Sequence, residues 1–176
     1  YEIYQCDWSS DVCSSDLGVA MRRIIRAFRA AGARTTFFCN GVNIAAHADA
    51  MRAALAAGDT IGAHTWSHKE LPDYPAAVQG AEMQGDIDAW WSVARAAPTP
   101  LLRPPYGLWS EATLRAAGQR GFAWVVLWNV DPSDYLDPPR AVLVQRVLAE
   151  ARPGAIVVMH VNANRSEEHT SELQSH

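Results

Sequence analysis

Hydrophobic and polar positions alternate along the chain in two patterns, one typical of strands and the other of helices. Short runs of β-branched, aromatic or aliphatic residues predict strands at 35–40, 59–64, 101–102, 122–129 and 155–160. Periodic or alanine-rich stretches predict helices at 19–31, 45–57, 75–96, 111–120 and 139–151. Gly32 and Gly58 are stop signals for two of these helices, and Ser110 is a suitable N-cap for another. The apolar run at 122–129 predicts a continuous, buried strand.

Strands that alternate with helices at this spacing predict βαβ units, a parallel sheet and right-handed crossovers. In such folds ligands bind where the strands end. His64, Arg103 and His160 each end a predicted strand, and Asp131 and Asp134 follow another. Several independent strands therefore bring ionisable side chains to one edge of the sheet, which indicates a site at that edge.

The two ends of the chain differ in character from the segment between them. Residues 7–17 read DWSSDVCSSDL and residues 165–176 read RSEEHTSELQSH, which match translations of the two ends of a standard sequencing adapter. We therefore interpret 1–17 and 165–176 as adapter-derived, and 18–164 as a fragment of a longer gene. Removing seven acidic residues and one Arg with these ends leaves 14 basic and 12 acidic residues, so the formal charge changes from −4 to +2.

Composition excludes several classes of function. A near-neutral domain with scattered arginines has no basic patch for nucleic acid. No run approaches the roughly 18 to 20 apolar residues that cross a membrane, and no secretory signal is recognisable. Cys39 is the one cysteine of the predicted domain, so cysteine usage gives no information on the redox compartment.

The segment HTWSH places His64 and His68 four residues apart. On a helical turn this spacing puts both imidazoles on one face, where they could chelate a divalent ion. The pair alone is weak evidence, because surface or capping histidines are common. A third ligand, most suitably a carboxylate, must come from elsewhere in the chain.

RPPYG at 103–107 predicts a rigid turn. Its two prolines fix the backbone, and Gly107 permits a tight turn that aims Arg103 and the amide of Tyr106. Taken alone, the segment is more typical of an ordinary turn than of a site.

DPSD at 131–134 offers two carboxylates, Asp131 and Asp134, which could also be loop caps. His160 ends an apolar strand, where a core histidine is the alternative. A carboxylate beside this ring would orient it and favour its protonated form, as a general acid requires.

In this order, the segments resemble the polysaccharide deacetylase family, the carbohydrate esterases with a NodB homology domain. TTFFCNG at 35–41 is similar to the family's second strand, HTWSH to its metal motif and RPPYG to its third motif. DPSDY at 131–135 and IVVMH at 156–160 are similar to its fourth and fifth motifs. The resemblance covers essentially all of 18–164. It implies an α/β fold, a distorted and here incomplete (β/α) barrel, that binds zinc or a related divalent ion through one Asp and two His.

The resemblance also implies a role for each matching residue. His64 and His68 would be metal ligands, and Arg103 would position the catalytic base. His160 would be the general acid, tuned by Asp134 or, as a second candidate, by Asp131. The residues that would bind the substrate are Tyr106 through its amide, Gly107 beside it, Val158 in the acetyl pocket, and Tyr135, where Trp is usual.

One departure from the family bears on activity. The first motif, TFDDG or similar, supplies both the metal-binding Asp and the base Asp, and adapter residues occupy its place. We therefore expect 18–164 to lack the first strand and this chain to be inactive or nearly so. Val161 stands where an Asp commonly follows the last His, a milder change.

For the parent protein, the resemblance implies metal-dependent hydrolysis of acetyl groups from N-acetylated polysaccharide, either chitin-like oligosaccharide or peptidoglycan. Two alternatives stay open, a non-catalytic carbohydrate-binding relative and an O-acetyl xylan esterase. The family's usual location implies an extracytoplasmic or cell-envelope protein. Oligomeric state is not indicated by the sequence.

Overall fold

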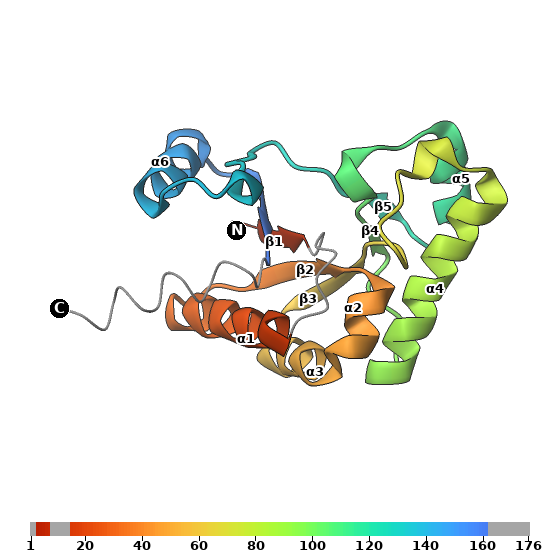
Figure 1. The fold of residues 1–176 in the computed structure, drawn as a ribbon, viewed down its shortest axis with the longest axis horizontal. Coiled ribbons are helices and arrows are strands. Elements are labelled where there is room, and N and C mark those ends of the chain that lie inside the picture. Colours follow the sequence, from red (N-terminus) through yellow and green to blue (C-terminus); the bar gives the residue numbers. More distant parts are fainter. Residues whose placement is uncertain (1–2, 8–14, 162–176) are drawn as a thin grey trace.

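Six parallel strands form one sheet in the order β5-β4-β3-β2-β1-β6 (Figure 1). The computed structural model describes residues 3–7 and 15–161, with side chains from residue 18 onward. Strands β1 to β5 lie in chain order, and the last strand returns to pair with the first. This is the order of a (β/α) barrel that is open between β5 and β6. The strands are β1 Ile3–Asp7, β2 Thr35–Cys39, β3 Thr60–Ala63, β4 Leu101–Leu102, β5 Trp124–Val125 and β6 Ile156–His160.

Helices follow the strands, as the sequence predicted. The α-helices are α1 Ser15–Ala30, α2 Gly41–Ala46, α3 Ala48–Ala57, α4 Ala76–Ala94, α5 Glu111–Gln119 and α6 Arg140–Glu150. Three short 3-10 helices are η1 Leu71–Asp73, η2 Pro105–Gly107 and η3 Asp134–Leu136. Among the described residues no helix combines the length and the apolar character that a bilayer crossing demands.

Local sequence explains where these helices begin and end. Ser110 accepts a hydrogen bond from the backbone N–H of Thr113 at 3.3 Å, and the Thr113 hydroxyl accepts one from the Ser110 N–H, which completes a capping box for α5. Gly58 ends α3 in the left-handed conformation, with φ of 77°. Both boundaries follow the sequence prediction.

The predicted helix at 45–57 is instead two helices, α2 and α3. The side chain of Asn40 accepts a hydrogen bond from the Asn43 N–H, so the first helix starts at Gly41. His47 then leaves the helical region, with φ −123° and ψ 39°, and the second helix begins after it.

The prediction of a continuous, buried strand at 122–129 was wrong. Only Trp124 and Val125 form β5, and the Trp124 side chain is 67% exposed. β5 pairs with the two-residue strand β4 and lies at an edge of the sheet, so one neighbour is missing and burial is lost. The chain then leaves the sheet and reaches β6, where Val130 forms an isolated bridge with Val157.

The first strand of the sheet comes from residues outside the predicted domain 18–164. Residues 3–7, which we interpret as adapter-derived, form β1 between β2 and β6, with Tyr4 in register with Thr35 and Val157. An extended segment is favoured here because it pairs its backbone groups on both sides. The origin of residues 1–17 and 165–176 stays a prediction, and 165–176 lie outside the described residues.

The hydrophobic core has two large clusters and a small one. The first includes Phe37 and Met51 and packs α1 and α3 against the sheet, and the second joins α4 and α5 to β3 and β4 around Met83 and Leu102. The third holds Val130, Ala155 and Val157 beside β6. Both large clusters therefore lie on the β2–β4 side of the barrel.

Candidate metal and catalytic site

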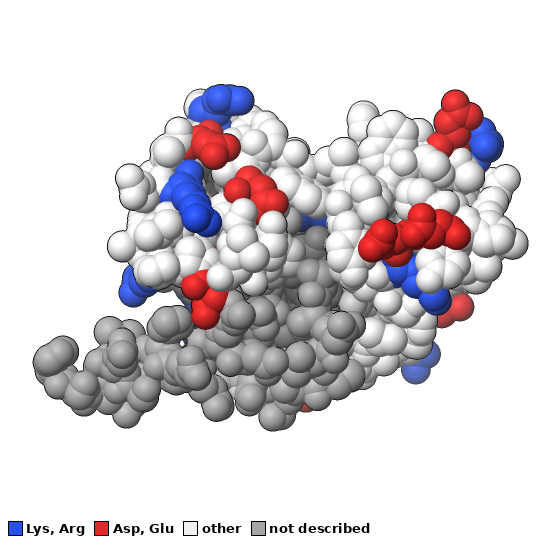
Figure 2. Space-filling view, turned by 45° about the horizontal axis from the view of Figure 1, so that its top comes forward, with Lys and Arg blue, Asp and Glu red and all other residues white. Residues whose placement is uncertain are grey.

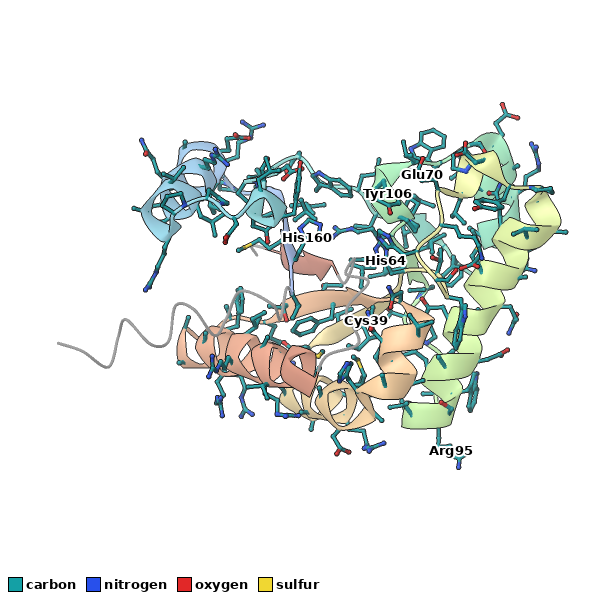
Figure 3. The ribbon with its side chains drawn as sticks, in the orientation of Figure 1. Cys39, His64, Glu70, Arg95, Tyr106 and His160 are labelled. Carbon is teal, nitrogen blue, oxygen red and sulfur yellow. The ribbon has the colours of Figure 1, made fainter. Side chains whose placement is uncertain are left out.

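The carboxyl ends of the strands carry the polar residues that the sequence singled out. In Figure 3, His64 beyond β3, Tyr106 beyond β4 and His160 at the end of β6 lie on the same side of the sheet. Figure 2 shows a hollow in this region, between the lobe that holds α6 and the lobe that holds α4 and α5. The face drawn there carries acidic and basic side chains dispersed among neutral ones. Residues far apart in the sequence therefore meet at one edge of the barrel.

His64 has the tautomer of a metal ligand. Its side chain is fully buried, and Nδ1 lies 2.7 Å from the carbonyl oxygen of Arg103. A carbonyl can only accept, so Nδ1 carries the hydrogen and the neutral ring has its lone pair on Nε2. The ring of His68 lies 4.8 Å from that of His64, centroid to centroid. The structure thus brings the two predicted ligands together.

The HTWSH segment is not a helical turn, which corrects the geometry that we expected. Residues 64–70 form a loop, and two non-glycine residues in it have left-handed backbones, Thr65 with φ of 70° and His68 with φ of 62°. Such conformations are costly for residues with a Cβ atom and persist only where surrounding contacts hold them. The histidines therefore meet through a strained loop, and their helical spacing is incidental.

Two buried acids on α4 hold this loop, and the sequence analysis missed them. Asp86 Oδ2 accepts a hydrogen bond from the His64 backbone N–H at 2.7 Å, and Glu82 accepts one from the Ser67 N–H at 2.7 Å. The available signal was their position on the helix. Glu82 and Asp86 are four residues apart on the face that also buries Met83, which is unusual for acids.

These two acids have opposite pKa shifts. Burial raises the pKa of Asp86 well above its usual value, while the hydrogen bonds from the backbones of His64 and Thr65 lower it only partly. Burial also acts to raise the pKa of Glu82, but hydrogen bonds from Lys69 and Ser67 outweigh it and lower the pKa.

Arg103 is fully buried beneath the hollow between the two lobes, which we call the opening. Its guanidinium lies over the rings of Phe38, at 4.4 Å from the centroid, and Trp128, at 5.3 Å. It also donates to the carbonyl oxygens of Val126 at 3.3 Å and Leu127 at 3.4 Å. Arg103 therefore ties the segment that crosses from β5 to β6 to the end of β4.

The RPPYG turn depends on left-handed residues at its end. Tyr106 has φ of 57° and Gly107 has φ of 70°, and a Cβ atom at Gly107 would lie 3.0 Å from the Trp128 ring. The Tyr106 ring packs edge-to-face on His68, with centroids 4.6 Å apart. The turn thus places Tyr106 directly beside the predicted metal ligands.

On the other side of the opening, Asp134 holds His160 by two hydrogen bonds. Asp134 Oδ1 lies 2.8 Å from His160 Nδ1, and Oδ2 accepts from the His160 backbone N–H at 2.6 Å. The Tyr135 ring stands nearly perpendicular to the imidazole, with centroids 5.5 Å apart. Asp134 and Tyr135 together fix the plane of the His160 ring, with Nδ1 on the side of Asp134.

Of the remaining predicted residues, Val158 lies near His160 and Asp131 does not contact it. Val158 is buried in β6, two residues before His160 and hence on the same face of the strand. Asp131 instead faces solvent in the loop before η3. It is exposed and accepts a hydrogen bond from the Ser133 N–H at 2.8 Å, so it caps the loop, while Asp134 contacts the histidine.

The two histidines fit a divalent metal but do not complete its site. Neutral imidazoles with a lone pair on Nε2 are suitable ligands. Among the side chains that the structure describes, no three His, Cys, Asp or Glu residues are grouped to hold a metal ion. Asp7 ends β1 in register with both Phe38 and His160, and its side chain lies outside the described residues.

Comparison with known proteins gives consistent results for sequence and fold. The family model described as polysaccharide deacetylase matches residues 15–125. The chain is 34% identical over 129 residues to a chitooligosaccharide deacetylase of Bradyrhizobium sp. (strain ANU 289), which covers 71% of this chain and 57% of that relative. It is 30% identical over 125 residues to a peptidoglycan-N-acetylmuramic acid deacetylase of Bacillus subtilis (strain 168), covering 71% of this chain and 26% of that relative. The chain therefore spans little more than half the length of the first of these relatives.

Solved structures show the same fold. A family 4 carbohydrate esterase from Streptomyces lividans superposes with a TM-score of 0.76 at 24% identity, covering 93% of this chain and 80% of that chain. A CE4 family pseudoenzyme from Bacillus anthracis superposes with a TM-score of 0.82 at 19% identity, covering 98% of this chain and 58% of that chain. One is described as an esterase and the other as a pseudoenzyme, so the fold alone does not establish turnover.

Proposed function

The chain belongs to the polysaccharide deacetylase family, and on that premise we propose that the protein carrying this domain hydrolyses acetyl groups from N-acetylated polysaccharide. One observation carries the proposal. A pair of imidazoles, His64 and His68, lies on one side of the opening, and an imidazole held by a carboxylate, His160, lies on the other. The first pair would hold a metal ion that polarises the acetyl carbonyl, and His160 would protonate the leaving amine from the other side.

Family membership implies a divalent metal, and we propose zinc. His64 and His68 would hold it, because neutral imidazole is a common zinc ligand and the tautomer of His64 suits that role. When bound, the ion supplies Lewis acidity to the acetyl carbonyl and to a nucleophilic water. The third ligand and the base are the carboxylates that the family's first motif carries.

His160 supplies the proton for the leaving amine. Asp134 lies 2.8 Å from Nδ1, so a proton delivered to the leaving amine would come from Nε2. Because Asp134 also accepts from the His160 backbone N–H, the ring and its strand are fixed together. An amine is a poor leaving group without a proton, which makes this positioned imidazolium the chain's main catalytic contribution.

Two further residues prepare the site for the acetyl group. The amide of Tyr106, on its left-handed turn beside His68, would help to hold the developing oxyanion. Arg103 keeps the carboxyl end of β4 next to the crossing segment, and through it would position the base. Both roles require a rigid turn, and the buried Arg103 guanidinium supports one.

We propose an N-acetylated glycan, chitin-like oligosaccharide or peptidoglycan, as the substrate. The relatives named above act on these two polymers. Tyr106 and Tyr135 are half-exposed aromatic side chains on opposite sides of the opening, which suits contact with sugar rings. Peptidoglycan lies outside the cytoplasm, so we also propose an extracytoplasmic or envelope location.

Acetate release tests this function. The protein extended upstream to include its first motif should release acetate from chitotetraose or peptidoglycan in the presence of Zn²⁺, and lose this activity with a chelator. His160→Gln and Asp134→Asn should each lower the rate, by about 10²-fold or more for the general acid. The 176-residue chain alone should release little or no acetate. An extended protein that binds glycan without releasing acetate would overturn the proposal.

A second candidate is favoured by one observation. The fold is shared with a CE4 family pseudoenzyme from Bacillus anthracis, which favours a non-catalytic carbohydrate-binding relative as the second candidate. Paired aspartates upstream support the enzyme, and their replacement supports the binder. Acetylated xylan belongs in the same assay, because preferential release from it would identify an O-acetyl esterase.

A further inference from the structure

The loop that carries His64 and His68 is held from behind by α4, on the side away from the catalytic opening. Glu82 and Asp86 lie one helical turn apart on that helix and are both buried. Neither belongs to a motif by which the family is recognised in this sequence. Both direct their carboxylates to the backbone or side chains of residues 64–69.

Asp86 fixes the first half of the loop. Its carboxylate accepts a hydrogen bond from the backbone N–H of His64 at 2.7 Å. His64 is thereby held at two points, its N–H by Asp86 and its Nδ1 by the carbonyl of Arg103. These contacts determine both the position of the ring and which nitrogen keeps the lone pair.

Glu82 fixes the second half of the loop. Its side chain accepts from the Ser67 N–H at 2.7 Å and the Ser67 hydroxyl at 2.8 Å, and pairs with the Lys69 ammonium. Its backbone carbonyl accepts from the Trp66 N–H at 2.8 Å. Together, Glu82 and Asp86 bind the backbone N–H groups of His64, Trp66 and Ser67.

Helix α2 closes the loop from the other side. The N–H groups of Gly41 and Val42 donate to the carbonyl oxygens of Thr65, at 2.9 Å, and Trp66, at 3.2 Å. Gly41 is required here, because a Cβ atom would lie 2.3 Å from the Trp66 ring. The left-handed conformation of Thr65 is therefore enclosed by hydrogen bonds from two helices.

Two buried acids are not the side chains that would make this helix most stable. A buried carboxylate costs free energy that an apolar side chain of similar size would avoid. Among the described residues, Asp86 Oδ1 has no hydrogen-bond partner, which adds to that cost. The compensating gain is the fixed loop geometry.

We propose that Glu82 and Asp86 are positioning residues that set the geometry of the two metal-binding histidines. The inference rests on the proposed function in that it takes His64 and His68 as metal ligands. It predicts that the loop is already ordered before metal binds, so that the imidazoles need no rearrangement to bind the ion.

The first test needs no metal. In the 176-residue chain, long-range ¹⁵N–¹H NMR reports the tautomer of each imidazole, and hydrogen exchange reports the order of amides 64–68. Asp86→Leu and Glu82→Gln should speed exchange of these amides by at least about tenfold, and Asp86→Leu should mix the tautomers of His64. Asp86→Asn keeps one oxygen acceptor and should restore much of the wild-type behaviour. Asp88→Asn, on the exposed face of the same helix, should change nothing.

The second test uses Co²⁺ as the probe. Loss of a contact that orients a ligand weakens metal affinity by about 10- to 100-fold, so Asp86→Leu and Glu82→Gln should bind Co²⁺ at least tenfold more weakly than Asp88→Asn. If Asp86→Leu does not fold, Glu82→Gln decides the question. Folded variants with unchanged tautomers, exchange and affinity would overturn the proposal.

The two tests also separate this inference from the proposed function. A wild-type chain that binds no Co²⁺ but loses loop order in the variants retains the positioning role and contradicts metal binding by this chain. Unchanged loop order in a protein that releases acetate contradicts the positioning role alone.

Discussion

The two sides of the hollow at the strand ends differ in how deeply their polar residues are buried. On the β2–β4 side, His64 and Arg103 are fully buried, and the two large hydrophobic clusters lie behind them. On the β6 side, the side chains of His160 and Asp134 are 18% and 10% exposed, and among the described side chains a small cluster lies beside the strand. Among the described residues, the side that carries His64 is thus packed against the core, while His160 is held mainly by its hydrogen bonds to Asp134.

The difference arises from how many neighbours each element has. β3 lies between β2 and β4, with α3 and α4 in contact, whereas β6 is an edge strand that pairs with β1 and touches Val130. Helix α6 stands apart from the other helices in Figure 1 and contains no fully buried residue. We therefore expect local opening to be easier on the β6 side.

The largest contrast should appear on removing apolar side chains from the two sides. Phe37→Ala, in the first cluster, should lower the free energy of unfolding by about 3–5 kcal/mol. Leu148→Ala, on α6 with a side chain 70% exposed, should change it by about 0.5 kcal/mol or less. Urea unfolding measures both, and equal losses would remove the distinction between the sides.

Hydrogen exchange should show the same contrast without mutation. The amides of β2 and β3 should exchange through global unfolding, and those of α6 through local opening. We expect protection to differ by at least about 100-fold, equivalent to about 2.7 kcal/mol at 25 °C. Uniform protection across β2, β3 and α6 would mean that the domain opens as a single unit.

Removing the Asp134 carboxylate should loosen only the β6 side. Asp134→Ala removes two hydrogen bonds to His160 and should destabilise the domain by about 1.5–3 kcal/mol, with faster exchange in β6 and η3. Asp131→Ala, its neighbour in the same loop, is the matched control and should cost about 1 kcal/mol or less. A larger loss from Asp131→Ala would reverse the assignment of the two carboxylates.

The smallest effects should distinguish the two acids behind the metal-binding loop. The folded-state pKa of Asp86 is raised by burial, so its contribution to stability is fully present below its unfolded pKa and is lost as pH rises through the folded pKa. The pKa of Glu82 is lowered, so its contribution is present above its unfolded pKa and is lost as pH falls through the folded one.

Unfolding curves between about pH 3 and 8 test this sign. Asp86→Asn should weaken the decline of stability with rising pH, and Glu82→Gln should weaken the decline on acidification. The same direction of change in both variants would show that one of the two pKa shifts has been assigned the wrong sign.

Sequence patterns predicted the helices and most strands because period and capping are local properties. The capping box at Ser110 and the stop at Gly58 are visible in a few consecutive residues. The strand at 122–129 failed for a non-local reason. Its apolar run suits burial, but its length and exposure depend on a two-residue neighbour and an unpaired edge.

Some site residues could likewise be identified from local sequence, while others depended on contacts between distant segments. His64, His68, Arg103, Asp134 and His160 could be named from residue type at strand ends and from motif resemblance. The motif resemblance favoured Asp134 over Asp131 as the partner of His160, and the coordinates show that Asp134 makes the contact while Asp131 caps the loop. Glu82 and Asp86 were missed because their role depends on how α4 packs behind a loop far from it in sequence.

The sequence by itself determined the order of strands and helices and the chemical groups delivered to the strand ends, because both follow from periodicity and residue type. Tertiary structure alone fixed the contact between a carboxylate and a histidine. It also decided that HTWSH forms a strained loop, held by hydrogen bonds from α2 and α4, rather than a helical turn. The physical reason is that a hydrogen bond between distant segments depends on distance and angle, and neither is encoded in the spacing of residues along the chain.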